Sequence, residues 1–245
     1  MTTTMAIVLA AGKGTRFNSD LPKVLHHIHG KPMVHHVIET VQQCGITTTC
    51  LVVGYQKEKV QASCQQYNLL YATQAQQLGT GHALQCAIGT IKETMPDQCI
   101  VLAGDCPLVQ AGTLKRLLDT HNIEDASATI LTAMLPDAGA YGRIIRNQNT
   151  RTIIAIKEAA DCSDDERLIQ EFNSGIYCFN TAHLIDSIQH LSSNNQQSEY
   201  YLTDIIELLS KKKHTIAGYC IKNPIEVSGA NTQTELKALE NHLVS

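Results

Sequence analysis

The chain has 245 residues, of which 43% are hydrophobic and 17% charged, a composition typical of a globular protein with one large or two small domains. Its 19 basic and 23 acidic residues give a net charge of −4 at pH 7. This balance argues against general nucleic-acid binding, because that function requires a basic surface.

Strands and helices alternate along the first half of the chain. The pattern predicts, in order, a buried strand at 5–10, a helix at 32–45, a strand at 47–55, helices at 57–67 and 80–91, a strand at 98–105, a helix at 112–121 and a strand at 126–135. Such alternation is typical of βαβ crossovers. We therefore predict an α/β fold with a Rossmann-like, mostly parallel open sheet flanked by helices.

The pattern loosens after Leu135. We expect two strands within 140–159 joined by a polar turn at 147–149, a strand at 172–180, a helix at 181–191 and a closing helix from Thr232. Thr232 and Glu235 fit a capping box, in which the threonine accepts a first-turn amide and the glutamate reaches back. No linker composition separates these elements, so we predict a single domain over 1–245, elaborated after residue 135.

Other sequence features bear on compartment and partners. Nine cysteines without a CxxC pair, several in apolar runs, favour reduced and buried thiols in a cytoplasmic protein. The opening segment MTTTMAIVLA does not resemble a signal peptide, and no stretch has the length of a membrane span. We expect the histidines of HHIHGKPMVHH to be solvated or at the edge of the core, and Lys211–Lys213 to form a solvated helix end.

A glycine-rich segment, AAGKGTRFNSDLPK, begins where the first predicted strand ends. In an open parallel sheet, ligands bind at the carboxyl ends of the strands. Small residues let backbone amides approach an anion, and Lys13, Arg16 and Lys23 add positive charge. A Walker A loop is absent, and Phe17 stands where a dinucleotide fingerprint needs its third glycine. We therefore predict a phosphate-rich ligand at this turn.

The stretch LAAGKGTRFNSDLPKVLHHIHGKPMVHHVI is similar to the signature of sugar-nucleotide pyrophosphorylases. More narrowly, the chain resembles the uridylyltransferase half of bacterial bifunctional N-acetylglucosamine-1-phosphate uridyltransferases. The likeness continues in order through QAQQLGTGHA, LAGDCPL, YGRI, QEFNSGIY, EYYLTDII and EVSGAN. It implies the nucleotide-diphospho-sugar transferase fold, with the sugar-binding elaboration mainly after residue 135. The bifunctional relatives continue into an acetyltransferase β-helix, whereas this chain has no hexapeptide repeats, so we expect a free-standing monomer.

The resemblance also implies a role for each matching residue. Arg16 and Lys23 would be catalytic and stabilise the transferring phosphoryl group. Asp105 and Asn231 would coordinate Mg²⁺, and a carboxylate just past an apolar strand suits such a hard cation. The sugar would be held by Gly142, Glu158 and Asn173. The nucleotide would be held by Leu9, Ala10, Ala11, Gly12, Gln74, Gly79, Thr80, Ala103 and Gly104, where Ala103 replaces a tyrosine of the family and the Gln74 amide can match the edge of uracil.

The reaction implied by the resemblance is Mg²⁺-dependent uridylyl transfer from UTP to N-acetylglucosamine 1-phosphate. Its products would be pyrophosphate and UDP-N-acetylglucosamine, a precursor of cell-envelope polysaccharides such as peptidoglycan and lipopolysaccharide. Two alternatives stay open. One is a nucleotidyltransferase of another substrate pair, including cytidylyl or guanylyl transfer. The other is a non-catalytic nucleotide-sugar-binding module, against which the joint presence of Arg16, Lys23, Asp105 and Asn231 argues. Neither nucleic acid nor a membrane is an expected partner.

Overall fold

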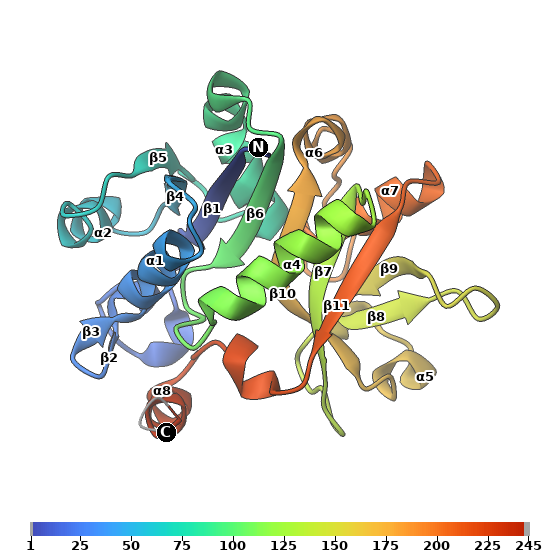
Figure 1. The fold of residues 1–245 in the computed structure, drawn as a ribbon. Coiled ribbons are helices and arrows are strands. Elements are labelled where there is room, and N and C mark those ends of the chain that lie inside the picture. Colours follow the sequence, from blue (N-terminus) through green and yellow to red (C-terminus); the bar gives the residue numbers. More distant parts are fainter. Residues whose placement is uncertain (1, 243–245) are drawn as a thin grey trace.

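A computed structural model describes residues 2–242, and within them nine strands form one large sheet (Figure 1). Seven of these strands run side by side in the order β11-β7-β10-β6-β1-β4-β5, and β8 and β9 extend the sheet from β10. Their bounds are β1 (Thr4–Ala10), β4 (Thr48–Val53), β5 (Leu70–Thr73), β6 (Gln98–Ala103), β7 (Ala128–Met134), β8 (Arg143–Arg146), β9 (Ile153–Lys157), β10 (Glu171–Asn180) and β11 (Ile216–Ile221).

The sheet is mostly parallel, which confirms the predicted fold class. Strands β5, β4, β1 and β6 run parallel to one another, and β11 runs parallel to β7. Strand β10 lies antiparallel between β6 and β7, where Tyr177 pairs with Val101 on one side and Ile130 on the other. Strand β10 therefore joins the two parallel groups, although it comes after both β6 and β7 in the sequence.

Helices cover both faces of the sheet and give the molecule three layers. Alternate residues of a strand point to opposite faces, so Ala6 and Val8 enter one core cluster while Met5 and Ile7 enter the other. The first cluster is covered by α1 (Met33–Gln43), α2 (Lys57–Ser63) and α4 (Ala111–Ile123). The second is covered by α3 (Thr80–Thr94), α6 (Thr181–Ile188) and α7 (Asp204–Lys211). Figure 1 shows α4 crossing the near face of the sheet.

The last helix with described bounds, α8 (Gln233–Glu240), packs beside the short hairpin of β2 (His27–Ile28) and β3 (Lys31–Pro32). Phe17 and Ile28 form a third core cluster with Leu236 and Leu239 of α8. His29 at the hairpin turn donates its amide hydrogen to Glu240 Oε1 at 2.9 Å. The end of the described chain is thereby attached to the segment that follows β1.

The predicted hairpin after Leu135 is confirmed. Strands β8 and β9 pair antiparallel, and Asn147 Oδ1 accepts the amide hydrogens of Asn149 and Thr150 at 2.9 and 3.0 Å. Gly45, with φ of +90°, occupies the C′ position after α1 and its C-cap residue Cys44. Elements that the pattern did not predict are β2, β3, β5, α5 (Asp164–Arg167), α7 and β11.

The predicted capping box of the closing helix is wrong in its second half. Thr232 accepts the amide hydrogen of Glu235 at 3.1 Å, as expected. Glu235 Oε2, however, accepts from the backbone of Asn231 at 2.7 Å rather than from Thr232. The carboxylate therefore reaches one residue further back and fixes the backbone of Asn231.

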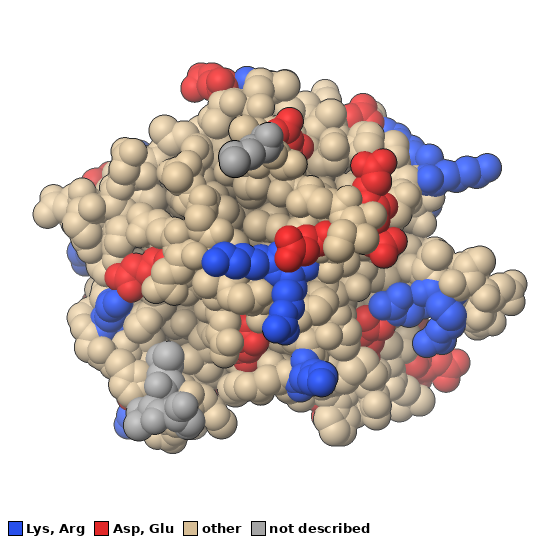
Figure 2. Space-filling model, in the orientation of Figure 1, with Lys and Arg blue, Asp and Glu red and all other residues tan. Residues whose placement is uncertain are grey.

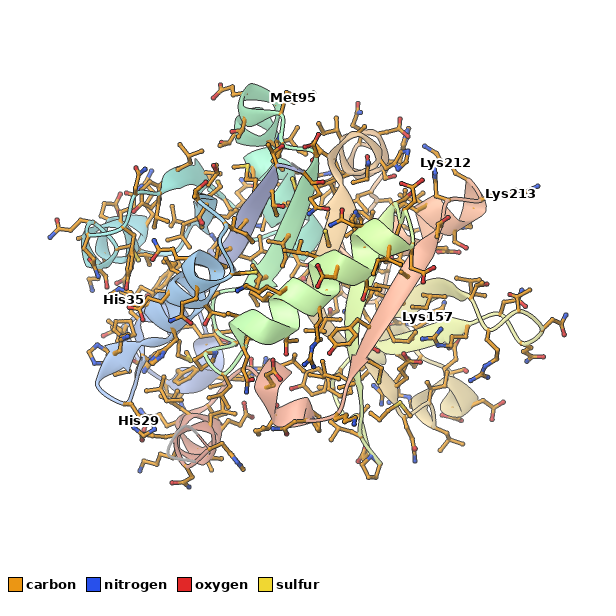
Figure 3. All side chains as sticks on the ribbon, viewed as in Figure 1. His29, His35, Met95, Lys157, Lys212 and Lys213 are labelled. Atoms are coloured by element: carbon orange, nitrogen blue, oxygen red, sulfur yellow. The ribbon has the colours of Figure 1, made fainter. Side chains whose placement is uncertain are left out.

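Charged and polar side chains at the surface lie largely as the sequence indicates. Lys211–Lys213 are exposed at the end of α7, and Figure 3 shows Lys212 and Lys213 at the edge of the molecule. Lys and Arg are interspersed with Asp and Glu on the face drawn in Figure 2. Six of the nine free cysteines are buried, whereas Cys220 is exposed. No helix within residues 2–242 is long and apolar enough to cross a membrane.

Candidate active site

A cavity of about 300 Å³ opens at the carboxyl ends of β1 and β6. Eight of the nine predicted nucleotide-binding residues line it: Leu9, Ala10, Ala11, Gly12, Gln74, Gly79, Thr80 and Ala103. The ninth, Gly104, donates its amide hydrogen to Leu9 O at 2.9 Å and so ties the ends of the two strands together. The structure therefore gathers at one cavity residues that are spread over about a hundred positions of sequence.

Gln74 is held in one orientation at the wall of this cavity. The side chain is almost wholly buried, and its Nε2 contacts Gly79 O at 3.0 Å and His82 Nδ1 at 3.1 Å. Both amide hydrogens thus have acceptors if His82 Nδ1 is unprotonated. The amide oxygen, Oε1, forms no hydrogen bond within the described residues and is the atom available to a ligand.

The wall beside Gln74 is formed by close contact between residues 78–81 and 199–202. Gly79 has φ of +106°, and a Cβ atom there would lie 2.6 Å from Tyr200 O. Gly81 donates its amide hydrogen to the same carbonyl at 2.7 Å. Only glycine fits position 79, for both conformational and steric reasons. The contact brings Glu199 to the cavity wall, and sequence analysis missed this residue together with Val24, Gln77 and Ala83.

The four predicted catalytic and metal-binding residues meet at one point. The Lys23 ammonium forms an ion pair with the Asp105 carboxylate and donates to Asn231 Oδ1 at 2.7 Å. Arg16 Nη2 donates to the same oxygen at 3.1 Å. The Lys23 and Asp105 side chains are only 15% and 17% exposed, so their interaction is screened less than a surface pair. Arg16 and Asn231 are 215 positions apart in the sequence.

Two glycines allow the backbone to approach these charged groups. Gly14 has φ of +66°, and a Cβ atom there would lie 2.6 Å from Lys23 Cβ. A Cβ atom on Gly229 would lie 3.3 Å from Asp105 Oδ2. The glycine-rich segment therefore has a packing role as well as a conformational one, because it leaves room for the lysine that pairs with Asp105.

The donor set at this point fits a hard divalent cation. One carboxylate oxygen and one amide oxygen already converge on a single cationic group, the Lys23 ammonium. Among residues 2–242 there is no cluster of three or more His, Cys, Asp or Glu side chains able to hold a metal. A Mg²⁺ ion here would have few protein ligands and would need water and substrate phosphates to complete its octahedron.

The three predicted sugar-binding residues also lie together, and none of them lines the nucleotide cavity. The backbone amide of Asn173 donates its hydrogen to Gly142 O at 2.8 Å. A Cβ atom on Gly142 would lie 3.5 Å from Glu158 Oε2. Glu158 Oε1 accepts from Thr203 Oγ1 at 2.9 Å. Burial raises the pKa of Glu158. This carboxylate lines a separate cavity of about 360 Å³.

The three predicted sugar-binding residues are positioned by Arg143, which sequence analysis did not single out. Arg143 is 2% exposed and forms no ion pair within the described residues. Its guanidinium donates to Tyr141 O, to Gly139 O at 3.1 Å and to Arg167 O at 3.4 Å. The side chain therefore links the loop before Gly142 to the end of α5.

Comparisons with known proteins identify the family and the fold to which this chain is similar. Residues 6–199 match the family described as MobA-like NTP transferase domain. The chain is 44% identical over 238 residues to the bifunctional protein GlmU of Clostridium botulinum and 41% identical to that of Syntrophomonas wolfei. Each match covers 97% of this chain but 51% and 52% of those relatives, so the chain spans about half their length.

A solved structure from Bacillus anthracis is similar in fold. That protein, provisionally assigned as a glucose-1-phosphate thymidylyltransferase and crystallised with sucrose, superposes with a TM-score of 0.77 at 20% identity. The superposition covers 98% of this chain and 95% of the other. At this identity the likeness establishes the shared architecture.

Proposed function

This chain belongs to the MobA-like NTP transferase family, and we propose that it transfers the uridylyl group of UTP to N-acetylglucosamine 1-phosphate. The chain is a nucleotidyltransferase, and the observation that supports catalysis is the convergence of Lys23, Arg16, Asp105 and Asn231 at one point. The choice of uracil and of N-acetylglucosamine rests on the resemblance to the uridylyltransferase half of the bifunctional enzymes.

The proposed reaction is an in-line displacement at the α-phosphorus of UTP. An oxygen of the sugar phosphate forms a bond to this phosphorus, and the bond from the phosphorus to the bridging oxygen of pyrophosphate breaks. The products are UDP-N-acetylglucosamine and pyrophosphate. Because the attacking oxygen is already ionised, no general base is needed, and catalysis depends on positioning and on neutralising charge.

Lys23 and Arg16 are the cations available for this neutralisation. Each now donates to Asn231 Oδ1, so each can exchange a neutral amide acceptor for a phosphate oxygen. Charge-assisted hydrogen bonds to the α-phosphoryl group and the departing pyrophosphate would strengthen as negative charge develops on them. Asp105 and Asn231 would hold Mg²⁺, which when bound offsets the repulsion between the two anionic substrates.

Gln74 favours uracil over cytosine in this proposal. The available Oε1 atom can only accept a hydrogen bond. Uracil carries an N3–H donor, whereas N3 of cytosine is itself an acceptor. Pairing two acceptors would leave both without a hydrogen, and a buried unsatisfied acceptor costs about 1–3 kcal/mol. The orientation imposed by Gly79 and His82 therefore supports a uridylyl rather than a cytidylyl donor.

The decisive experiment measures pyrophosphate release with a matrix of nucleoside triphosphates and sugar 1-phosphates in the presence of Mg²⁺. We expect the highest kcat/KM for UTP with N-acetylglucosamine 1-phosphate and loss of turnover in EDTA. A preference for CTP or GTP would replace the proposed substrate pair by another within the same reaction class. Binding of UDP-N-acetylglucosamine without turnover of any pair would instead support a binding module.

A further inference from the structure

Strand β10 bulges directly after Asn173, one of the residues proposed to bind the sugar. Between its pairs with Thr132 and Ile130 of β7, the strand has three residues, 174–176, opposite the single residue Leu131. Bulges are frequent next to active sites, where they turn a side chain in a new direction. The bulge in β10 therefore calls for a functional explanation.

The bulge is fixed by hydrogen bonds of its own residues. Ser174 Oγ donates to Leu131 O at 2.6 Å and accepts the amide hydrogen of Ile176 at 3.1 Å. Gly175 has φ of +78°, in the left-handed region that favours glycine. The amide of Gly175 donates to Asn173 Oδ1 at 3.1 Å. The bulge therefore holds the oxygen end of the Asn173 side chain.

Tyr177 holds the nitrogen end of the same amide. Asn173 Nδ2 donates to Tyr177 Oη at 2.6 Å. Residues four positions apart in a regular strand are separated by about 13 Å, so the bulge shortens the distance that this contact must span. Tyr177 is 2% exposed, and its ring stacks on Phe179 with 5.5 Å between the centroids. Burial and the nearby Glu158 carboxylate raise the pKa of Tyr177, so its hydroxyl stays protonated.

The Asn173 side chain keeps part of its hydrogen-bonding capacity. A side-chain amide has two N–H donors and an oxygen with two lone pairs. Tyr177 takes one donor and Gly175 one lone pair, and the amide forms no other side-chain hydrogen bond within residues 2–242. Because Asn173 is 8% exposed, a ligand must enter its site to use the rest. An acetamido group carries an acceptor and a donor on different atoms and can satisfy both, whereas a hydroxyl has both on one oxygen.

We propose that Tyr177 is a positioning residue whose hydroxyl fixes the orientation of the Asn173 amide, and that this orientation sets how strongly the enzyme distinguishes a 2-acetamido sugar 1-phosphate from its 2-hydroxyl counterpart. The inference rests on the proposed function, because it takes Asn173 as a sugar-binding residue. A site with fixed polar groups rejects a ligand that leaves them unpaired, and an amide that is free to rotate loses this selectivity.

The experiment measures the ratio of kcat/KM for N-acetylglucosamine 1-phosphate to that for glucose 1-phosphate, at saturating UTP and Mg²⁺. The folded fraction of the enzyme cancels in this ratio, so partial unfolding cannot imitate the effect. Tyr177→Phe keeps the ring and removes the hydroxyl. The ratio should fall about five- to tenfold, since one hydrogen bond to the amide is lost, while KM for UTP stays unchanged. Tyr67→Phe, which loses a hydroxyl that donates to Glu39 at 2.9 Å, is the matched control and should keep the wild-type ratio.

A double-mutant cycle tests whether Tyr177 acts through Asn173. In the Asn173→Ala background, Tyr177→Phe should not lower the ratio further, because the amide that it orients is gone. An equal fall in both backgrounds would show that Tyr177 acts independently of Asn173 and would overturn the inference.

Two further outcomes separate the inference from the proposed function. A wild-type ratio in Tyr177→Phe, even with a lowered Tm, shows a purely structural role and overturns the inference while leaving the proposed function in place. If the wild type turns over neither sugar phosphate with UTP, the proposed function falls and the inference falls with it.

Discussion

Lys23 Nζ lies 2.7 Å from Asn231 Oδ1 although 208 positions separate the two residues. The same ammonium pairs with the Asp105 carboxylate. One lysine thus satisfies both oxygens proposed to bind Mg²⁺, so a bound ion would compete with the ammonium for them. Lys23 could then donate to the substrate phosphates instead of to Asp105 and Asn231.

Replacing Lys23 should therefore have opposite effects on turnover and on metal binding. Lys23→Met should lower kcat by about a hundredfold or more, because a cation that stabilises the transition state is lost. Its affinity for Mn²⁺, followed by electron paramagnetic resonance without nucleotide, should rise because the competing ammonium is gone. Lys211→Met, which breaks the exposed pair with Glu207, is the matched control and should alter neither quantity. Normal turnover in Lys23→Met would show that this lysine takes no part in catalysis.

Variants of the two proposed Mg²⁺ ligands, Asp105 and Asn231, should respond differently to added Mg²⁺. Asp105→Asn keeps the size of the side chain but removes its charge, so activity should be lost at every Mg²⁺ concentration while the fold is retained. Asn231→Ala removes one neutral ligand and should raise the Mg²⁺ concentration needed for half-maximal rate, with partial rescue at high Mg²⁺. Rates measured against Mg²⁺ concentration test both. An unchanged dependence in both variants would place the metal elsewhere.

Substitution of Glu158 should affect one substrate more than the other. Glu158→Gln keeps the shape of the side chain and its acceptor for Thr203 Oγ1 but removes the charge. Because Glu158 lies with Gly142 and outside the nucleotide cavity, we expect KM for the sugar phosphate to rise several-fold while KM for UTP stays close to wild type. Steady-state kinetics with each substrate varied in turn is the measurement, and parallel changes in both KM values would contradict this placement.

A buried histidine makes stability depend on pH. His121 is 4% exposed, its Nδ1 lies 2.9 Å from Thr129 Oγ1, and burial lowers the pKa of its imidazole from the ordinary 6.5 to about 4. Between pH 4 and pH 6.5 the imidazole binds a proton in the unfolded chain but not in the folded protein. The contribution of His121 to the free energy of unfolding therefore falls as pH decreases from 6.5 toward 4, by about 3 kcal/mol at most.

His121→Gln tests this linkage because glutamine stays neutral across the range. Denaturant unfolding at pH 7 and pH 4.5 should show a smaller loss of stability in the variant than in the wild type. His190→Gln, at an exposed position, provides the control and should leave the pH dependence as in the wild type. An equal loss in His121→Gln and the wild type would mean that other groups carry the acid sensitivity.

The sequence allowed the glycine-rich turn and the strands leading into it to be predicted, because both depend on local rules. Gly12 and Gly14 follow an unbroken apolar strand, and Lys23 follows a proline, so the turn and the cations on it were predictable from local spacing. The pairing of Lys23 with Asp105 and Asn231 was not predictable in the same way. It depends on the order of strands in the sheet and on the return of the chain through α8.

Strand β11 was missed for a related reason. Gly218 interrupts the alternation of β11, and a Cβ atom there would lie 2.8 Å from Ile153 Cδ1, so the glycine serves a tertiary contact that the local pattern cannot show. Helix α7 has eight residues, as the predicted helices α6 and α8 do, so its length does not explain why it was missed. The reach of Glu235 to Asn231 was missed because a backbone N–H donor one residue before Thr232 also lies within reach of the carboxylate.

The position of β10 between β6 and β7 also constrains the order in which the molecule can be made. As the chain leaves the ribosome, β1, β4, β5 and β6 are available together and can pair with short separations. Strand β7 emerges soon after but has no neighbour until residues 171–180 have been synthesised. Asn231 arrives later still. A nascent chain can thus form the side of the nucleotide cavity made by β1 and β6 before residues 199–202 close its wall and before Asn231 completes the charged centre. Until β10 has been made, the β6 edge is open to pairing with other chains.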